Sequence, residues 1–242
     1  LRLVGSEMCI RDSNRYINTK LWILFIINIA IYIISLTLEL KFIYSDSFYY
    51  QELGHKLGSE EAFLKEMSVQ RGMDIYNYLW IPVHILISCS LIALCLFIGF
   101  NIANIRLNIK NCIRFSLAGI IVFSINYLIS VILKIFGIVQ YNYNTVDDIY
   151  SYQSVNVLFI GKKLPAWAFK LLGQINITEV VFVLFLSLLI SRYFKFKYPA
   201  ILLKTSLIYG GGLIIYGILS AFADIIFCLL YTSPSPRDGA TS

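Results

Sequence analysis

The sequence predicts an all-α membrane protein, a polytopic transmembrane helical bundle with about five spans. Hydrophobic residues make up 58% of the 242 residues and charged residues only 14%. Soluble domains carry about 25% charged residues, and a soluble chain of this length exposes too much surface to hide so many apolar side chains. The uninterrupted apolar runs also exclude the alternating pattern of a membrane β-barrel. Helices remain, because they satisfy their own backbone hydrogen bonds in lipid.

Five apolar runs define the predicted spans. A helix that rises ~1.5 Å per residue needs about 20 residues to cross ~30 Å of hydrocarbon. The runs that meet this requirement most closely cover residues 21–40, 78–100, 116–139, 177–191 and 205–227. The first run has no small-residue cleavage site, so we interpret it as a span and not as a signal peptide.

The two ends of the chain differ in composition from the middle. Residues 1–13 and 228–242 are polar and carry the pairs Arg11–Asp12 and Arg237–Asp238. Both segments resemble translated sequencing-adapter read-through, and we expect them to be artefacts of that kind, which do not belong in fold reasoning. The five-span membrane domain is then residues 14–227. The alternative is that the ends are two disordered tails.

The direction of the spans follows from the positive charges in the short loops. The loops after the second and fourth spans contain no acid, and their basic residues are Arg106, Lys110, Arg114, Arg192, Lys195 and Lys197. The acidic loop residues concentrate in the two longer loops. Lys and Arg favour the cytoplasmic side. The pattern therefore predicts an amino end inside and a carboxyl end outside.

Three of these basic residues also form a candidate lipid-headgroup site. Arg106, Lys110 and Arg114 would share one face of a helix if the inner loop were helical, and that face would contact anionic lipid. A positive-inside signal without a further role is the simpler interpretation, and we favour it. In the loop before the second span, Ser59 is placed to cap a short helix that runs to Gln70, with Gly72 to end it.

Catalytic signatures are missing from the sequence. It contains no HExxH, GxxxxGK[ST], GxGxxG or GxSxG motif. There are two histidines, His55 and His84, and the five cysteines show no metal-ligand spacing. We therefore predict a protein that is not an enzyme and holds no cofactor and no metal.

Ionisable residues inside the spans are the remaining chemical signal, because such residues are costly in lipid and are often functional. With the predicted direction, all of them lie toward the outer side. The candidate intramembrane polar cluster consists of His84, Lys134, Glu179 and Asp224. Glu39 closes the first span on the same side and is the fifth titratable group at this depth; the alternative is that it already lies in water. Lys134 and Asp224 are the expected ion pair.

Each member of this cluster also has a purely structural interpretation. Glu179 follows Asn176 by three residues, the spacing of a capping box, so it would serve only to begin a helix. Lys134 is placed to extend its ammonium to the lipid headgroups. Asp224 is close to the suspect carboxyl end. These interpretations are favoured over a substrate or proton site.

Small residues at helical spacing mark the last span as a packing surface. Such residues let two membrane helices approach closely. The set consists of Ser206, Gly210, Gly211, Gly212, Gly217 and Ala221. Adjacent glycines also permit a bend, and we favour close packing over a hinge.

The second half of the chain carries a family resemblance. Leu164-Pro165-Ala166-Trp167 is followed by Leu172-Gly173-Gln174-Ile175-Asn176, an apolar span, a basic turn and a glycine-rich last span. This order resembles the bacterial Yip1-like integral membrane proteins over roughly residues 154–227, and the five-span layout is similar to theirs. The resemblance implies a small helical membrane protein, linked in eukaryotes to vesicle trafficking, with no catalytic residue to transfer.

Two functions are therefore open. The favoured one is a non-enzymatic protein of the bacterial cytoplasmic membrane that acts by helix packing with partners or lipid. Its expected partners are membrane lipids, other membrane proteins or a second copy of the chain, and not nucleic acid. The alternative is a small transporter or permease component that uses the outer polar cluster. Inverted repeats would favour the alternative, and the sequence contains no recognisable pair.

Overall fold

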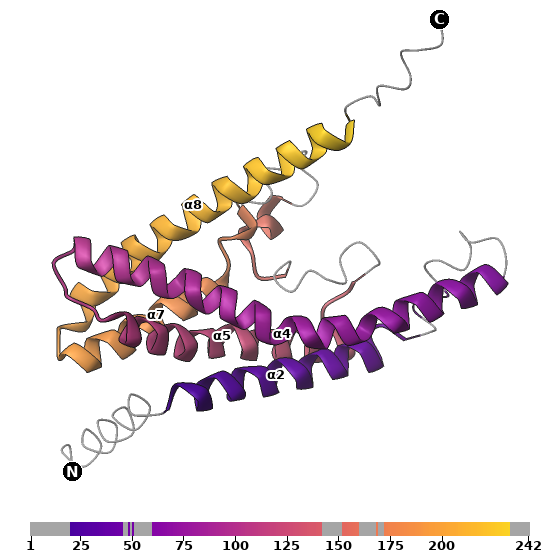
Figure 1. The fold of residues 1–242 in the computed structure, drawn as a ribbon, viewed down its shortest axis with the longest axis horizontal. Coiled ribbons are helices and arrows are strands. Elements are labelled where there is room, and N and C mark those ends of the chain that lie inside the picture. The colour runs from indigo at the N-terminus through magenta and orange to yellow at the C-terminus, as the bar shows by residue number, and fades with distance from the viewer. Residues whose placement is uncertain are drawn as a thin grey trace, which may run out of the picture.

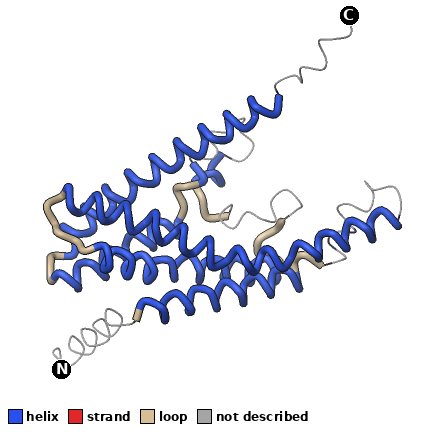
Figure 2. The backbone as a smooth tube through the Cα atoms, viewed as in Figure 1, coloured by secondary structure: helices blue, strands red, loops and turns tan. Residues whose placement is uncertain are grey.

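The described part of the protein is helical throughout (Figures 1 and 2). The computed structural model describes residues 20–45, 48, 50, 60–141, 152–159, 168 and 172–232. The elements are α2 (Leu21–Phe42), α4 (Glu60–Ile102), α5 (Ile109–Ile135), the 3-10 helix η1 (Val155–Phe159), α7 (Ile177–Phe194) and α8 (Tyr198–Thr232). Five helices are long and apolar enough to cross a membrane. The predicted all-α, multi-pass class and its five spans are confirmed.

The ends of the helices depend on local capping residues and turns, and they do not coincide with the ends of the apolar runs. α5 begins at Ile109, before the predicted third span, because the side chain of Asn108 caps it by accepting a hydrogen bond from the backbone N–H of Lys110 at 3.1 Å. It ends at Ile135, before the predicted limit, because Gly137 adopts a φ of 70° that stops the helix. At α5 the helix therefore begins before the predicted span 116–139 and ends before its limit.

The second span contains the clearest boundary error. The prediction that a short helix ends near Gly72 is wrong, because α4 is one helix of 43 residues that continues through Gly72 and contains Pro82. An isolated glycine in a helix costs only about 1 kcal/mol relative to alanine, too little to end a helix by itself. At ~1.5 Å per residue α4 measures roughly 65 Å, so it extends beyond any bilayer it crosses.

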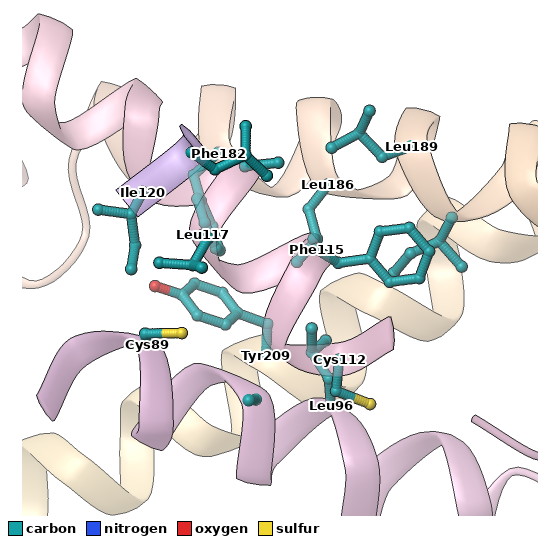
Figure 3. Close-up of a cluster of buried hydrophobic side chains, with 14 of the residues drawn as sticks. Cys89, Leu96, Cys112, Phe115, Leu117, Ile120, Phe182, Leu186, Leu189 and Tyr209 are labelled. Carbon is teal, nitrogen blue, oxygen red and sulfur yellow. The ribbon is translucent and has the colours of Figure 1, made fainter. Parts of the chain in front are cut away.

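The helices form a bundle in which α5 has a central place. α5 packs against α2, α4 and α7, and α8 packs against α7 and α4. Figure 3 shows part of the core, to which Leu96 of α4, Phe115 of α5 and Phe182 of α7 contribute. Tyr209 reaches into the same cluster from α8.

Two glycines permit the closest helix crossings. A Cβ atom on Gly119 of α5 would lie 2.5 Å from Cε2 of Phe182, and one on Gly99 of α4 would lie 2.2 Å from Cγ2 of Ile208. Neither distance is sterically allowed. These helices therefore approach as closely as they do because the glycines carry no side chain.

The two short turns lie at the same end of the bundle. The α4–α5 and α7–α8 turns and the start of α2 are together on the left of Figure 1. The side chain of Asn111 donates a hydrogen bond to the Tyr193 hydroxyl at 3.0 Å, and Phe115 stacks edge-on with Tyr193. We call this the basic end, because the acid-free loops are here, and the opposite end the far end. Which end faces the cytoplasm stays a prediction.

Candidate functional site

Polar side chains line the buried face of α2. Asn28, Ser35 and Glu39 recur at helical spacing on this face, and the first two are fully buried. A buried polar group in an apolar bundle is costly unless it is hydrogen-bonded. The partners of these residues therefore determine how α2 is held in the bundle.

Asn28 joins α2 to α5. Its Nδ2 donates to the carbonyl oxygen of Leu24 at 2.9 Å and to that of Leu117 at 3.0 Å, and its Oδ1 accepts from the Ser124 hydroxyl at 2.6 Å. Two of these bonds cross between helices. The amide is fully engaged, so it fixes the depth and rotation of α2 against α5.

Glu39 continues this interface toward the far end. The Tyr127 hydroxyl donates a hydrogen bond to Oε2 of Glu39. The alternative that Glu39 already lies in water does not fit, since only 6% of its surface is exposed. The reason is that the last turn of α2 still packs on α5, where Ile43 and Val131 are buried together.

Aromatic rings connect these polar groups. The ring centroid of Tyr32 lies 5.6 Å from that of Tyr127 and 5.9 Å from that of His84, the latter in an edge-to-face arrangement. His84 is itself exposed on the outer surface of the helices. We call the internal set the polar seam, and it consists of Asn28, Tyr32, Glu39, Ser124 and Tyr127.

Lys134 follows Tyr127 by two turns on the same face of α5. Its side chain is 3% exposed, so the expectation that it extends into the headgroups does not fit the structure. The side chain of its predicted partner Asp224 lies outside the described residues. The ion pair between Lys134 and Asp224 therefore stays a prediction.

Glu179 makes a second carboxyl–tyrosine contact, between α7 and α8. The Tyr209 hydroxyl donates to Oε2 of Glu179 at 2.8 Å. The ring of Tyr209 packs on Phe182 with centroids 4.7 Å apart. Asn176 caps α7 as its spacing predicts, accepting from the backbone N–H of Glu179 at 2.9 Å. The carboxyl group therefore has a partner beyond its own helix.

The predicted cluster is thus spread over separate places. His84 contacts Tyr32 of α2, Lys134 is buried on α5, and Glu179 contacts α8. The sequence gives the depth of each group in the membrane, but depth does not say which helix faces oppose one another. Asn28 and Tyr127 carry no charge, so the pattern of charged residues in the spans does not indicate them.

A short segment folds back onto the far end of α5 and α7. The side chain of Gln153 donates to Oδ1 of Asn126 at 3.1 Å and accepts from the Thr178 hydroxyl at 3.0 Å. Ser154 pairs with Asn176 in an isolated antiparallel bridge. We call this arrangement of Asn126, Gln153, Ser154, Asn176 and Thr178 the polar bridge.

The polar bridge contains buried atoms without hydrogen-bond partners. They are Nδ2 of Asn126 and Oγ of Ser154. Oδ1 of the neighbouring Asn156 is also buried without a hydrogen-bond partner. Nearby, burial raises the pKa of Tyr152, and its hydrogen bond with Ser130 opposes that shift. Buried polar atoms of this kind are places where ordered water binds.

The basic residues do not form the helical face expected of them. α4 ends at Ile102, and Asn104 has a φ of 59°, so the chain turns before Arg106. Arg106 and Lys110 are exposed, whereas Arg114 is partly buried and its Nε has no hydrogen-bond partner. Lys110 and Arg114 lie four residues apart on α5, whereas Arg106 lies in the turn before it, so the three residues do not share one helix.

The small residues of α8 have two different environments. A Cβ on Gly212 would lie 2.6 Å from Sγ of Cys95, and Gly217 is buried. Gly210 and Gly211 have nothing within 4 Å of such an atom, and Ser206 is exposed. The side chain of Ala221 lies outside the described residues. Part of the set packs inside the chain, and part faces outward.

Comparison with known proteins adds no identity. No family model, curated protein or solved structure matches the chain. Within the described residues, no group of three or more His, Cys, Asp or Glu side chains is arranged to hold a metal ion. The five spanning helices thus identify a multi-pass membrane protein, and function must be argued from its surfaces and buried groups.

Proposed function

We propose that this chain is a non-enzymatic protein of the bacterial cytoplasmic membrane that acts by packing its last helix against another membrane protein. The observation that carries the proposal is the outward position of Ser206, Gly210 and Gly211 on α8. Ser206 is exposed, and a Cβ atom added to Gly210 or Gly211 would meet nothing within 4 Å, although α8 packs against α4 and α7.

An outward-facing glycine in a membrane helix is unfavourable on its own. Each costs about 1 kcal/mol in helix propensity relative to alanine and offers no side chain to the lipid. A second helix changes this balance, because small residues allow backbones to approach and pack closely. Exposed Leu207 and Ile214 flank the glycines and would provide the apolar rim of such a contact.

The family resemblance supports the same interpretation. The stretch that resembles Yip1-like proteins includes α7 and α8, and the resemblance implies a membrane protein without catalytic residues. Lipid is the competing occupant of the α8 face. A test must therefore distinguish a protein neighbour from the bilayer.

Photo-crosslinking in intact membranes makes that distinction. A photoreactive phenylalanine analogue is introduced at Ser206 of the full chain, and at exposed Ile34 of α2 as the control. We expect a discrete protein adduct from position 206 and only lipid adducts from position 34. Lipid adducts alone at both positions would contradict the proposal.

The polar seam favours a second candidate function, a small transporter or permease component. Hydrogen-bonded Asn28 and Ser124 lie inside the bundle, and intramembrane polar residues often mark a substrate path. The test is the reaction of Ser124→Cys with a membrane-impermeant thiol reagent, in a chain whose native cysteines are replaced. Labelling in intact cells would favour transport, and protection would leave the seam as a structural contact.

A further inference from the structure

The Glu179–Tyr209 contact is a chemical site that the packing proposal does not use. Glu179 lies in the first turn of α7 and is half-buried. Tyr209 lies about a third of the way along α8 and is 7% exposed. Their oxygens are 2.8 Å apart. A carboxyl group therefore enters the helix bundle and is held there by a neutral donor.

The surrounding titratable groups do not neutralise this acid. From α8 the group that reaches Glu179 is the Tyr209 hydroxyl. On α5, the Tyr127 hydroxyl is directed to Glu39, and Lys134 is buried on the same face as Tyr127. Tyr152, beside η1, is hydrogen-bonded to Ser130. Among the described residues, Glu179 has no ion pair with Lys, Arg or His.

A charged carboxylate is strongly disfavoured in such an environment unless it is paired. A proton removes the charge and still leaves Oε2 free to accept from Tyr209. We propose that Glu179 and Tyr209 form a proton-binding site within the membrane. Water delivers the proton to the second carboxyl oxygen and takes it back on release, while the tyrosine hydroxyl keeps its own proton.

The polar bridge supplies an independent indication of water at this place. It includes Asn176, which caps α7, and Thr178, which directly precedes Glu179 in the first turn of that helix. The partnerless buried atoms of Ser154 and Asn156 lie on the segment paired with Asn176. These atoms are therefore sites for water beside the first turn of α7, the turn that carries Glu179.

Carbodiimide labelling tests the proposal, because dicyclohexylcarbodiimide enters membranes and reacts with protonated carboxyl groups. The full chain is reconstituted in phosphatidylcholine vesicles, labelled across a pH series and digested for mass spectrometry. We expect an adduct on Glu179 that is at least about fivefold more abundant at about pH 6 than at about pH 9, because the reagent attacks the protonated carboxyl group and not the carboxylate. Exposed Glu61 should stay unlabelled.

Two variants separate the site from a general effect of folding. Tyr209→Phe keeps the ring on Phe182 and removes the hydroxyl, so the pH profile of labelling should change. Tyr216→Phe, at an exposed position of the same helix, should leave the profile unchanged. Wild-type protein that is monodisperse by size exclusion but unlabelled at Glu179 at about pH 6, or labelled equally at all pH values, would overturn the proposal.

Discussion

The α2–α5 interface and the α4–α8 interface hold the bundle together by different means. The first joins its helices through side-chain hydrogen bonds, with Asn28 donating to Leu117 and Tyr127 donating to Glu39. The second depends on close approach, with Gly99 against Ile208 and Gly212 against Cys95. In lipid, where apolar surface gains little by leaving its solvent, polar bonds and close packing are the two available ways to associate helices.

The two interfaces therefore tolerate different kinds of substitution. A hydrogen-bonded interface loses stability when a polar atom is removed. A close-packed interface loses it when an atom is added. Removing a polar atom from the first interface and adding an atom to the second therefore test the contrast.

Asn28→Ala should cause the largest loss. It removes two bonds between helices and one within α2, and interhelical bonds in membranes average about 0.6 kcal/mol and reach about 1.7. With the buried cavity included, we expect a loss of about 2–3 kcal/mol in the free energy of unfolding. Unfolding in mixed micelles with increasing sodium dodecyl sulfate measures it.

A matched control removes an amide of the same type from the surface. Asn101 is exposed near the end of α4 and bonds to the carbonyl of Phe97 in its own helix. Asn101→Ala should change the free energy of unfolding by less than about 0.5 kcal/mol. Equal losses for the two variants would mean that the seam does not hold α2 in place.

Gly99→Ala tests the close-packed interface. The added Cβ would lie 2.2 Å from Cγ2 of Ile208 and 3.0 Å from its Cβ, so the Ile208 side chain or the helix that carries it must shift. Overpacking of this kind costs about 1–3 kcal/mol. The same detergent titration measures the loss, and a stability gain at this position would show that the α4–α8 contact is looser than the structure indicates.

Tyr127→Phe tests the seam at its far end with a smaller change. The ring remains beside Tyr32, while Glu39 loses one hydrogen-bond donor. We expect a loss of about 1 kcal/mol in the free energy of unfolding. The double variant with Glu39→Gln should lose less than the sum of the two single losses, because both changes affect one interaction. Strict additivity would argue against the contact.

Gly72→Ala should have the smallest effect and the opposite sign. Gly72 lies inside α4 with nothing within 4 Å of an added Cβ. Alanine should stabilise the helix by up to about 1 kcal/mol through its higher helix propensity. Circular dichroism and the detergent titration both report the gain, and a loss would indicate that α4 breaks near this residue.

Sequence alone predicts the spans well, because each must present about 20 apolar residues to the bilayer. It also predicts the cap of α7 at Asn176 from local chemistry. It does not predict which faces meet. Asn28 carries no charge, and Glu39 lies at the end of its span. The sequence therefore does not indicate that either residue bonds to a side chain or carbonyl group of α5.

The small residues of α8 illustrate the same limit. Gly210, Gly211 and Gly212 are the same residue type in consecutive positions. Of these three, only Gly212 is at a position where an added Cβ would contact another helix of this chain. Successive residues point about 100° apart around a helix. The rotation of α8, which depends on all its contacts, therefore decides which glycine packs inside and which faces outward.

This division gives the most direct test of the proposed role of α8. Gly210→Leu and Gly212→Leu are compared in the full chain that carries the photoreactive residue at position 206. We predict that Gly210→Leu leaves the folded protein intact and abolishes the protein adduct, while Gly212→Leu reduces the folded protein itself because its side chain collides with Cys95. An adduct that persists undiminished in folded Gly210→Leu protein would contradict the claim that this face of α8 receives a partner.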